Sequence, residues 1–388
     1  MRRDWDVIVL GLGGIGSGGL YWLARELHGD VLGIEQFAPG HDRGGSQDHH
    51  RIIRYSYHRP CYVSLARGAY EAWGAVAADS GETLVVPVGG LDLFPPGGTI
   101  PLDDYTSSLD AEAIAYEILD ASQVRERWPA FRLDAGTVGL YQRDGGYVRA
   151  AAGNAAHLAL AREHGAQLAT GAPVEGLEAR GGEVTVEAGG VRYRCGRVVV
   201  CGGAWSNDLL APLGWRLPLT VTQEQVTYFQ PEQPELLAES RFPVWIWMDD
   251  PCFYGFPMLE GEGVKVAQDV GGREVTARTR TFEPDPEALG RVTGFLERFL
   301  PEALGPVRRV KTCLYTLTPD RDFVIDRVPE HPECMVAIGA GHAYKFASVI
   351  GRVLARLALG QEPGFDLEPF RIDRPILLEK DPPKQFMV

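Results

Sequence analysis

Asp6-Val-Ile-Val-Leu10 runs directly into Gly11-Leu-Gly-Gly-Ile-Gly16 near the N-terminus. The first part of this stretch is a short apolar run, which is typical of a strand buried in a parallel sheet. Its second part places glycine in a G-x-G-x-x-G pattern. Gly11 permits a tight turn, Gly13 lets the backbone approach a pyrophosphate, and Gly16 permits close packing of a helix. The stretch therefore predicts a strand, a phosphate-binding turn and a helix N-terminus that offers amide hydrogens to an anion.

A helix and a second strand are predicted after this turn. Apolar residues recur at the spacing of one helix face, at Leu20, Leu23, Ala24 and Leu27. Gly29 stands where a left-handed C-cap belongs. Residues 30–35 then read as a strand that ends in Glu35. Glu35 is expected to accept hydrogen bonds from ribose hydroxyls, and its charge disfavours the 2′-phosphate of NADP.

Further strands that lead into glycine-rich turns occur far along the chain. Residues 197–201 form an apolar run that ends in Gly202-Gly203-Ala204-Trp205, and this run is predicted to join the same sheet. Residues 323–326 and 335–338 read as two more strands. A helix face closed by Gly360 follows, at Phe346, Val349, Ile350, Val353, Leu354 and Leu357. The fingerprint alone does not separate NAD from FAD, but a return to the nucleotide domain near the C-terminus favours FAD.

The segments between these pieces have another character. Residues 84–94 and 241–270 are rich in aromatic and β-branched residues broken by Pro and Gly, which is typical of antiparallel strands. We therefore expect a mixed α/β (α+β) fold, in which a Rossmann-like FAD-binding domain of the glutathione-reductase type is interleaved with an antiparallel-sheet substrate domain. The expected FAD-binding domain comprises residues 1–85, 145–220 and 315–388, and the expected substrate domain comprises residues 86–144 and 221–314.

The composition argues against several other classes of protein. The 388 residues carry a net charge of −14, and an acidic surface repels the phosphates of nucleic acids and anionic membranes. No apolar run is long enough to span a bilayer, and Asp4 and Asp6 interrupt the likeness of the N-terminus to a signal peptide. The cysteines form no C-x-x-C pair and have no metal-ligand spacing, which predicts a reducing, cytoplasmic location and no metal: Cys61, Cys195, Cys201, Cys252, Cys313 and Cys334.

Three segments together resemble the monomeric sarcosine oxidase family, which includes N-methyltryptophan oxidase. Gly45-Ser-Gln-Asp-His-His-Arg-Ile-Ile-Arg54 is similar to the family's G-S-x-x-x-x-R-I-I-R segment. Lys311-Thr-Cys-Leu-Tyr-Thr-Leu-Thr-Pro-Asp320, with Phe323-Val-Ile-Asp326, resembles the segment around the flavinylated cysteine. Gly339-Ala-Gly-His-Ala-Tyr-Lys-Phe346 resembles the glycine-rich G-H-x-[FY]-K-F turn. The order and spacing of the segments agree over essentially the whole chain.

The resemblance implies covalently bound FAD. Cys313 matches the cysteine that forms an 8α-S-cysteinyl bond to the isoalloxazine ring, although by itself it reads as a small buried hydrophobe. Arg51 matches a basic residue beside the ring, where positive charge would stabilise the anionic reduced flavin. Besides the glycine turn and Glu35, the residues implied to line the flavin or its nucleotide are Ser46, Val174, Gly202, Gly203, Trp205 and Lys345.

The resemblance also implies a catalytic and substrate site. Lys265 matches a lysine over the flavin that assists oxygen reduction, because a fixed ammonium stabilises the charge of superoxide; alone, a lysine in a strand is more often solvated. Arg54 and Lys345 match the cations that bind the substrate carboxylate, with a surface position or an internal ion pair as the alternative. Tyr254 and Tyr315 match tyrosines of the substrate pocket, or else belong to the core.

Three positions depart from sarcosine oxidases. Gln47, Trp245 and Asp269 stand where a histidine, a methionine and a histidine are typical. We expect Gln47 and Trp245 to bind substrate. We expect Asp269 to act with Tyr254 near the reacting amine, unless it pairs with Lys265 or an arginine. These differences leave the reaction class intact and the exact substrate open.

The implied activity is oxidation of a small secondary amino acid by a monomeric enzyme, with oxygen as the acceptor. A hydride equivalent moves from the carbon beside the neutral amine to the flavin, water hydrolyses the imine, and oxygen becomes hydrogen peroxide. Sarcosine, which would give glycine and formaldehyde, is the first candidate, and N-methyltryptophan, proline and pipecolate come next. The alternatives are a flavin dehydrogenase with another acceptor, a non-catalytic flavin-binding subunit and an NAD-dependent reductase.

Overall fold

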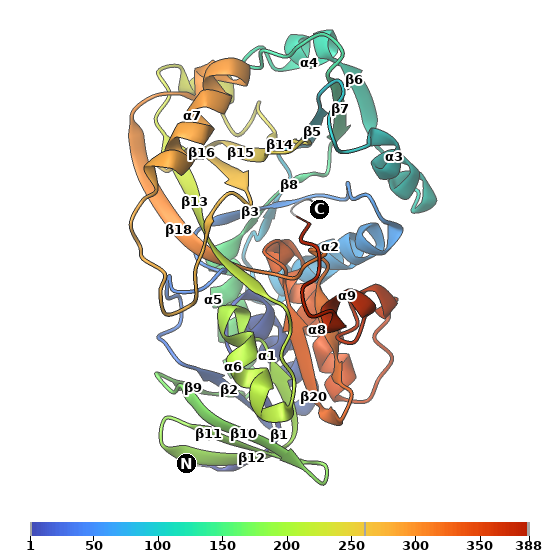
Figure 1. Cartoon of the computed structure of the whole chain (residues 1–388), viewed down its shortest axis with the longest axis vertical. Helices are drawn as coiled ribbons and strands as arrows, with labels where there is room; N and C mark the ends of the chain where they lie inside the picture. Colours follow the sequence, from blue (N-terminus) through green and yellow to red (C-terminus); the bar gives the residue numbers. More distant parts are fainter. Residues whose placement is uncertain (1, 260, 386–388) are drawn as a thin grey trace.

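The computed structural model describes residues 2–259 and 261–385. Figure 1 shows two regions stacked along the long axis, a lower one built around a sheet with helices against it and an upper one built around a second sheet. The lower sheet contains, in spatial order, β10 (Val174–Arg180), β11 (Glu183–Ala188), β12 (Val191–Val200), β1 (Asp4–Leu10), β2 (Val31–Glu35) and β9 (Gln167–Thr170). β20 (His331–Ile338) pairs with β12, and β19 (Val324–Val328) pairs with β20.

The predicted strand–helix–strand unit at the N-terminus is confirmed. β1 pairs in parallel with both β2 and β12, and α1 (Gly14–Leu27) connects β1 to β2. β12 also pairs in parallel with β20, so the distant runs share one sheet, as predicted. The predicted C-cap at Gly29 is wrong by one residue. His28 has the left-handed conformation (φ 47°) and donates its N–H to Ala24, so the helix ends before the glycine is reached.

The upper sheet is mostly antiparallel. Its order is β17 (Arg273–Glu274), β13 (Thr220–Phe229), β16 (Gly263–Asp269), β15 (Cys252–Leu259), β14 (Val244–Trp247), β5 (Gly90–Phe94), β7 (Val138–Gln142) and β6 (Glu117–Asp120), and β18 (Val307–Leu317) pairs with β13. One pairing differs from the antiparallel expectation, since β5 and β14 run parallel. The long connection between these two strands allows a crossover, whereas a short hairpin would force them to be antiparallel.

The remaining elements surround the two sheets. A small sheet between them contains β3 (His50–Ile53), β8 (Gly146–Arg149) and β4 (Val85–Val86). The helices not yet named are α2 (Pro60–Ser80), α3 (Leu102–Ala111), α4 (Ala121–Arg127), α5 (Ala150–Glu163), α6 (Ser206–Leu210), α7 (Pro286–Phe299), α8 (Ala347–Ala358) and α9 (Pro375–Leu378). Among the described residues, no helix combines the length and apolar character needed to cross a bilayer.

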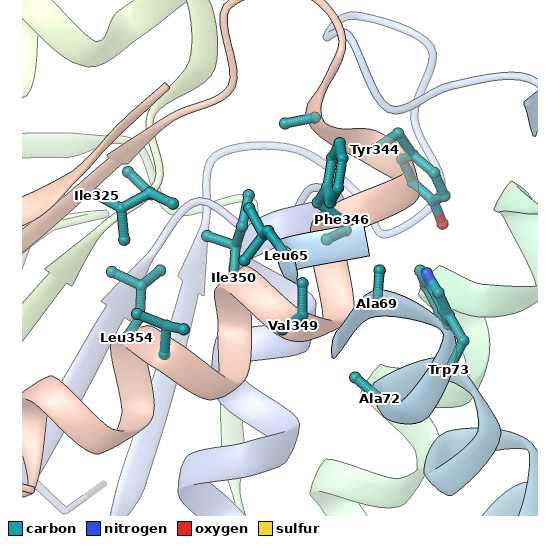
Figure 2. Packing of buried hydrophobic residues seen from close by; sticks show 14 of the residues in the cluster. Leu65, Ala69, Ala72, Trp73, Ile325, Tyr344, Phe346, Val349, Ile350 and Leu354 are labelled. Atoms are coloured by element: carbon teal, nitrogen blue, oxygen red, sulfur yellow. The ribbon is translucent and has the colours of Figure 1, made fainter. Parts of the chain in front are cut away.

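The predicted C-terminal helix packs into the core of the lower region. Val349, Ile350 and Leu354 of α8 are buried and face α2 and β19, as Figure 2 shows. Gly360 has φ +71° just after the helix, which is the left-handed conformation that was expected there. The lower sheet and its helices therefore carry both the N-terminal glycine turn and the C-terminal helix. The division of the chain into domains at the predicted residue numbers stays a prediction.

Candidate active site

A large cavity of about 720 Å³ runs from the β1–α1 turn to the face of the upper sheet. Its volume lies within the ~300–1,000 Å³ range of small-molecule sites. One end is lined by the glycine turn, and the other end is lined by residues of β14, β15, β16 and β18. Both sheets thus contribute to one elongated site.

The glycine turn leaves no room for side chains. A Cβ on Gly11 would lie 2.4 Å from the carbonyl oxygen of Cys201, and Gly11 has φ +83°. A Cβ on Gly16 would lie 1.8 Å from the carbonyl oxygen of Gly11. Gly13 lines the cavity, and a Cβ there would meet the hydroxyl of Ser46 at 3.1 Å. The hydroxyl of Ser46 accepts a hydrogen bond from the amide of Gly14 (2.8 Å). A residue outside the helix therefore helps to fix the conformation of the turn.

Glu35 lies at the end of β2 and lines the same end of the cavity. Its two carboxylate oxygens accept hydrogen bonds from the amides of Leu12 (2.8 Å) and Phe37 (3.0 Å). Burial alone would raise the pKa of Glu35, but these amides and nearby His41 hold it below its usual value. Glu35 is therefore an oriented carboxylate, as a ribose site requires. The other residues expected at the nucleotide also line this cavity, namely Val174, Gly202, Gly203 and Trp205.

Alternation along the upper sheet decides which side chains reach the cavity. Ile246 pairs across strands with Asp92 of β5 and Tyr254 of β15, and directly paired residues share a face of the sheet. Ile246 and Tyr254 line the cavity. Trp245 therefore points to the opposite face, where it is fully buried and stacks on Phe295 of α7 (ring centroids 5.6 Å apart). The prediction that Trp245 binds substrate is wrong, because its one-residue offset in the strand places it in the core.

Cys313 lies in β18, directly opposite Glu224 of β13. It is buried, and its neighbours Leu314 and Tyr315 line the cavity. Burial raises the pKa of the Cys313 thiol to about 11, and the positive charge of Arg51 opposes this rise. Arg51 itself lines the cavity and is held by the carbonyl oxygens of His50 (3.0 Å), Gly45 (3.1 Å) and Gln47 (2.5 Å).

Gln47 also lies at the cavity, but its amide is committed to the backbone. Its Nε2 donates to the carbonyl oxygen of Thr312 at 2.6 Å, next to Cys313 in sequence. Its side chain therefore ties the segment after Ser46 to β18. A role for Gln47 in substrate binding stays a prediction.

Lys265 does not lie on a solvated face. Its side chain is 1% exposed, and its Nζ donates to Asp48 at 2.6 Å and to the carbonyl oxygen of His50 at 2.9 Å. Asp48 lines the cavity, so Lys265 stands directly behind one wall residue. Burial lowers the pKa of Lys265 to about 8, and Asp48 opposes this effect.

Two cations occur at the upper end of the cavity in different settings. Arg54 donates to Asp92 at 2.7 Å and is buried, so the alternative of an internal ion pair is correct for Arg54, which nevertheless lines the cavity. Lys345, in the 3-10 helix Ala343–Phe346, also lines the cavity. No carboxylate among the described residues forms an ion pair with Lys345. Burial and the charge of Arg54 lower the pKa of Lys345 to about 7.

Asp269 and two tyrosines complete this end of the cavity. Asp269 accepts a hydrogen bond from Arg321 at 3.2 Å, and its side chain remains 20% exposed in a position that lines the cavity. Asp269 thus pairs with an arginine, which was the alternative, and it also faces the cavity, so a role near the substrate amine stays a prediction. Tyr254 and Tyr315 line the cavity, and burial raises the pKa of both hydroxyls, so both are neutral proton donors at neutral pH.

Sequence reasoning missed several residues of this site. The cavity-lining residues with no expected role include Asp48, Tyr57, Ile246, Met248 and His342. Asp92 was also missed, although it orients Arg54 and accepts a 2.5 Å hydrogen bond from Ser56. An isolated acid within an apolar strand such as residues 90–94 is a signal for a buried ion pair, and it could have pointed to Asp92.

The fold and the cavity define a dinucleotide-binding oxidoreductase, with a helix N-terminus and a ribose carboxylate at one end and the cations Arg54 and Lys345 at the other. Comparison with protein families narrows this class, because residues 6–357 match the family described as FAD dependent oxidoreductase (DAO). The chain belongs to this family and, within it, to the group that contains monomeric sarcosine oxidases and N-methyl-L-tryptophan oxidases. The glycine turn, Ser46 and Glu35 fit the nucleotide of FAD.

Similarity to characterised proteins extends over almost the whole chain. The monomeric sarcosine oxidase of Streptomyces avermitilis is 34% identical over 372 residues, which are 92% of this chain and 94% of that protein. The N-methyl-L-tryptophan oxidase of Yersinia pestis (strain Pestoides F) is 30% identical and covers 96% of this chain and 99% of that protein. Among solved structures, NikD, an unusual amino acid oxidase essential for nikkomycin biosynthesis, has a TM-score of 0.84 at 26% identity, covering 95% of this chain and 98% of that one.

Proposed function

We propose that this protein is an FAD-dependent oxidase of small secondary amino acids, with sarcosine as the first candidate substrate. The observation that carries the proposal is the partly buried Lys345, which lacks an ion-pair partner among the described residues and lines the cavity beside Arg54. A partly buried ammonium without a counter-ion is destabilised, and a substrate carboxylate between Lys345 and Arg54 would supply the missing partner. The relatives named above share this substrate chemistry.

The remaining residues have distinct proposed roles. Asp269 faces the cavity with one oxygen held by Arg321, so it can accept a hydrogen bond from the substrate amine. Tyr254 and Tyr315 donate hydrogen bonds and shield the reacting carbon from water. FAD bound in the cavity would supply the two-electron chemistry between the amine and oxygen, while the residues above would bind and orient the substrate. Lys265 supplies positive charge for the oxygen step.

A second candidate substrate class is favoured by the apolar wall of the cavity. Ile100, Ile246 and Met248 line it near Arg54, and the Met248 sulfur lies 3.8 Å from the guanidinium. An N-methyl or cyclic amino acid with a larger apolar part, such as proline, pipecolate or N-methyltryptophan, would pack on these side chains. Each additional methylene buried in such a pocket changes kcat/KM by about 10-fold or more.

Anaerobic reduction of the flavin tests this function. The flavin-loaded protein is mixed with sarcosine, proline, pipecolate and N-methyltryptophan, and the bleaching rate is followed at saturating substrate. Dimethylamine, which lacks the carboxylate, serves as the matched control and should reduce the flavin far more slowly. Equal rates with sarcosine and dimethylamine would contradict the carboxylate site.

We also propose that Cys313 carries the flavin through an 8α-S-cysteinyl bond. The buried thiol lies in a strand whose next residues line the cavity, and the charges of Arg51 and Lys265 favour its thiolate form. A thioether survives unfolding, so acid precipitation should leave the yellow colour in the pellet. Cys313→Ala should release it into the supernatant, whereas Cys201→Ala, at the nucleotide end, should not. Release from the unmodified, fully loaded protein would contradict the bond.

We also infer the cellular location and the oligomeric state of the protein. The six cysteines are free, which fits the reducing cytoplasm. We infer a cytoplasmic enzyme that acts as a monomer, since one chain supplies every cation and carboxylate described at the cavity. Sedimentation of the flavin-loaded protein should give the mass of one chain, and a larger mass would contradict the monomer.

A further inference from the structure

A buried polar network surrounds Asp48, which no role described so far explains. Its carboxylate accepts hydrogen bonds from Tyr228 (2.7 and 2.8 Å) and from Lys265 (2.6 Å). Lys311 lies 3.5 Å away and Arg51 lies 3.9 Å away. Asp48 is 7% exposed, and Lys265 is 1% exposed. One carboxylate thus lies within ion-pair distance of three cations at the cavity wall.

The backbone at Asp48 adopts an unusual conformation. Asp48 has φ +82°, in the left-handed region that residues other than glycine rarely adopt, although aspartate tolerates it better than most. Such conformations persist where surrounding contacts hold them, and they concentrate at functional sites. Here the contacts are the hydrogen bonds from Lys265 and Tyr228. The turn before β3 is therefore shaped so that this carboxylate points at the lysine.

The charges around Lys265 show what the carboxylate does. Burial favours the neutral amine, and the guanidinium of Arg51 acts in the same direction. The group that opposes them is Asp48, whose carboxylate accepts a hydrogen bond from Nζ at 2.6 Å. Cys313 would oppose them only as a free thiolate, and its thioether to the flavin would carry no charge. Asp48 itself stays ionised, since Lys265, Arg51 and the hydroxyl of Tyr228 hold its pKa far below the usual value despite burial. The imidazole of His50, which also faces Lys265, is neutral, because burial lowers its pKa to about 3.

We propose that Asp48 is a positioning residue that holds Lys265 as a protonated ammonium behind the cavity wall and thereby sets the pH range in which oxygen is reduced. The proposal rests on the oxidase function stated above. Oxygen takes two electrons from the reduced cofactor and two protons to become hydrogen peroxide, and the first electron creates an anion. A nearby ammonium stabilises that anion, while a neutral amine does not. Without Asp48, Lys265 would be a buried cation with no counter-ion.

The first test follows reoxidation of the reduced, flavin-loaded protein by oxygen as a function of pH. In the unmodified protein the rate should fall with a midpoint near the pKa of Lys265, about 8. In Asp48→Asn the midpoint should move down by about one pH unit or more, because the counter-ion is lost while Arg51 remains. At the original midpoint the variant should then be about fivefold slower than the unmodified protein, or slower still for a larger shift, and should recover at lower pH.

Two further variants separate this role from a general structural one. Lys311→Met removes the partly exposed cation on the other side of Asp48 (side chain 28% exposed) and should leave the midpoint near that of the unmodified protein. Lys265→Arg keeps the charge at every accessible pH, so the alkaline fall should vanish. Lys265→Arg leaves Asp48 unchanged, so this measurement can still be made if Asp48→Asn does not fold. A fall that persists in Lys265→Arg would overturn the proposal.

The second test reads the protonation of Lys265 without turnover. Because its pKa in the folded protein is lowered, the unfolded chain binds more protons above about pH 8, and stability should rise with pH up to the unfolded pKa of ~10.4. The free energy of unfolding is measured as a function of pH for the unmodified protein and for Lys265→Met. The difference between the two curves gives the contribution of Lys265, because Lys345 contributes equally to both. The same difference is then measured between Asp48→Asn and the double variant Asp48→Asn/Lys265→Met. In this pair the rise in stability should begin at a lower pH.

The outcomes distinguish the inference from the function on which it rests. If Lys265→Met reoxidises as fast as the unmodified protein, the oxygen role of Lys265 is wrong, and the function fails at that step. If Lys265→Met is slowed by about a hundredfold but neither the rate midpoint nor the stability rise moves in Asp48→Asn, the role of Asp48 is wrong. Movement of both midpoints, with Lys311→Met unchanged, supports the proposal.

Discussion

Arg54 and Lys345 were both expected to bind the substrate carboxylate, but their surroundings differ. Arg54 is neutralised by Asp92, which is itself fixed by Ser56, so its guanidinium is charged and oriented at every pH of interest. Lys345 has no such partner among the described residues, and its pKa is lowered to about 7. Of these two cations, Lys345 is therefore the one whose charge changes near neutral pH.

Carboxylate binding should depend on pH because of Lys345. Below pH 7 the ammonium is present, and above it the ligand must bind together with a proton. The affinity of a simple carboxylate such as acetate should therefore fall about tenfold per pH unit above the Lys345 pKa, until Arg54 alone remains. Titrations of the flavin spectrum at several pH values measure this dependence.

Substitutions at Lys345 assign the effect. Lys345→Arg should bind acetate with an affinity that no longer changes over this range, because arginine stays protonated. Lys345→Met should lose about 2–5 kcal/mol of binding free energy at low pH. Lys311→Met, which changes a lysine outside the cavity lining, is the matched control. The same slope in Lys345→Arg as in the unmodified protein would assign the titration to another group.

Single residues could be predicted where a chemical constraint acts on one position. Gly11 and Gly16 are dictated by contacts with neighbouring backbone, and they were found from spacing alone. Trp245 could not be placed, because every residue of Val244–Trp247 is apolar and the alternation therefore carries no sign of which face is buried. Asp48 was missed because its partner, Lys265, lies far away in the sequence.

At the scale of elements, α1 and α8 cross at glycines. A Cβ on Gly351 of α8 would lie 2.4 Å from the carbonyl carbon of Gly18 in α1, and a Cβ on Gly18 would lie 2.8 Å from the carbonyl oxygen of Ala347. The two helices therefore approach closely, backbone against backbone. This crossing supports the helix N-terminus that faces the nucleotide end of the cavity.

Gly351→Ala should destabilise the protein. The added methyl group has no space unless the helices separate, and overpacking of this kind costs about 1–3 kcal/mol. Gly290→Ala is the control, since Gly290 is an exposed glycine of α7 whose added methyl group would have no neighbour within 4 Å, and it should gain about 0.5–1 kcal/mol. Urea unfolding of both variants measures the difference. A neutral Gly351→Ala would mean that the crossing is looser than described.

Elements were predictable where their pattern is local. The strand, turn and helix at residues 4–27 and the helix Ala347–Ala358 follow from apolar spacing and terminal glycines. Pairing between distant strands was not predictable. β5 and β14 are separated by a long connection and run in parallel. The residues of neither strand indicate whether its neighbour runs parallel or antiparallel to it. The αL position at His28 was missed because glycine is usually preferred there.

At the scale of the molecule, the chain passes repeatedly between two sheets. The strands of the lower sheet come from residues 4–35, 167–200 and 324–338, and those of the upper sheet come from residues 90–142 and 220–317. The sequence predicted this interleaving because glycine-rich turns recur near the C-terminus. It could not predict the cavity, which exists only because side chains from both sheets line the same space. The reaction and the residue roles expected at this cavity came from the family resemblance, which three short segments carry.

An oxidase couples the oxidation of a small secondary amino acid to the reduction of oxygen. The stoichiometry of turnover with sarcosine tests this coupling, with oxygen consumed, hydrogen peroxide formed and formaldehyde formed measured in one reaction. We expect equal amounts of all three. Flavin reduction by sarcosine without oxygen consumption would instead identify a dehydrogenase with another acceptor.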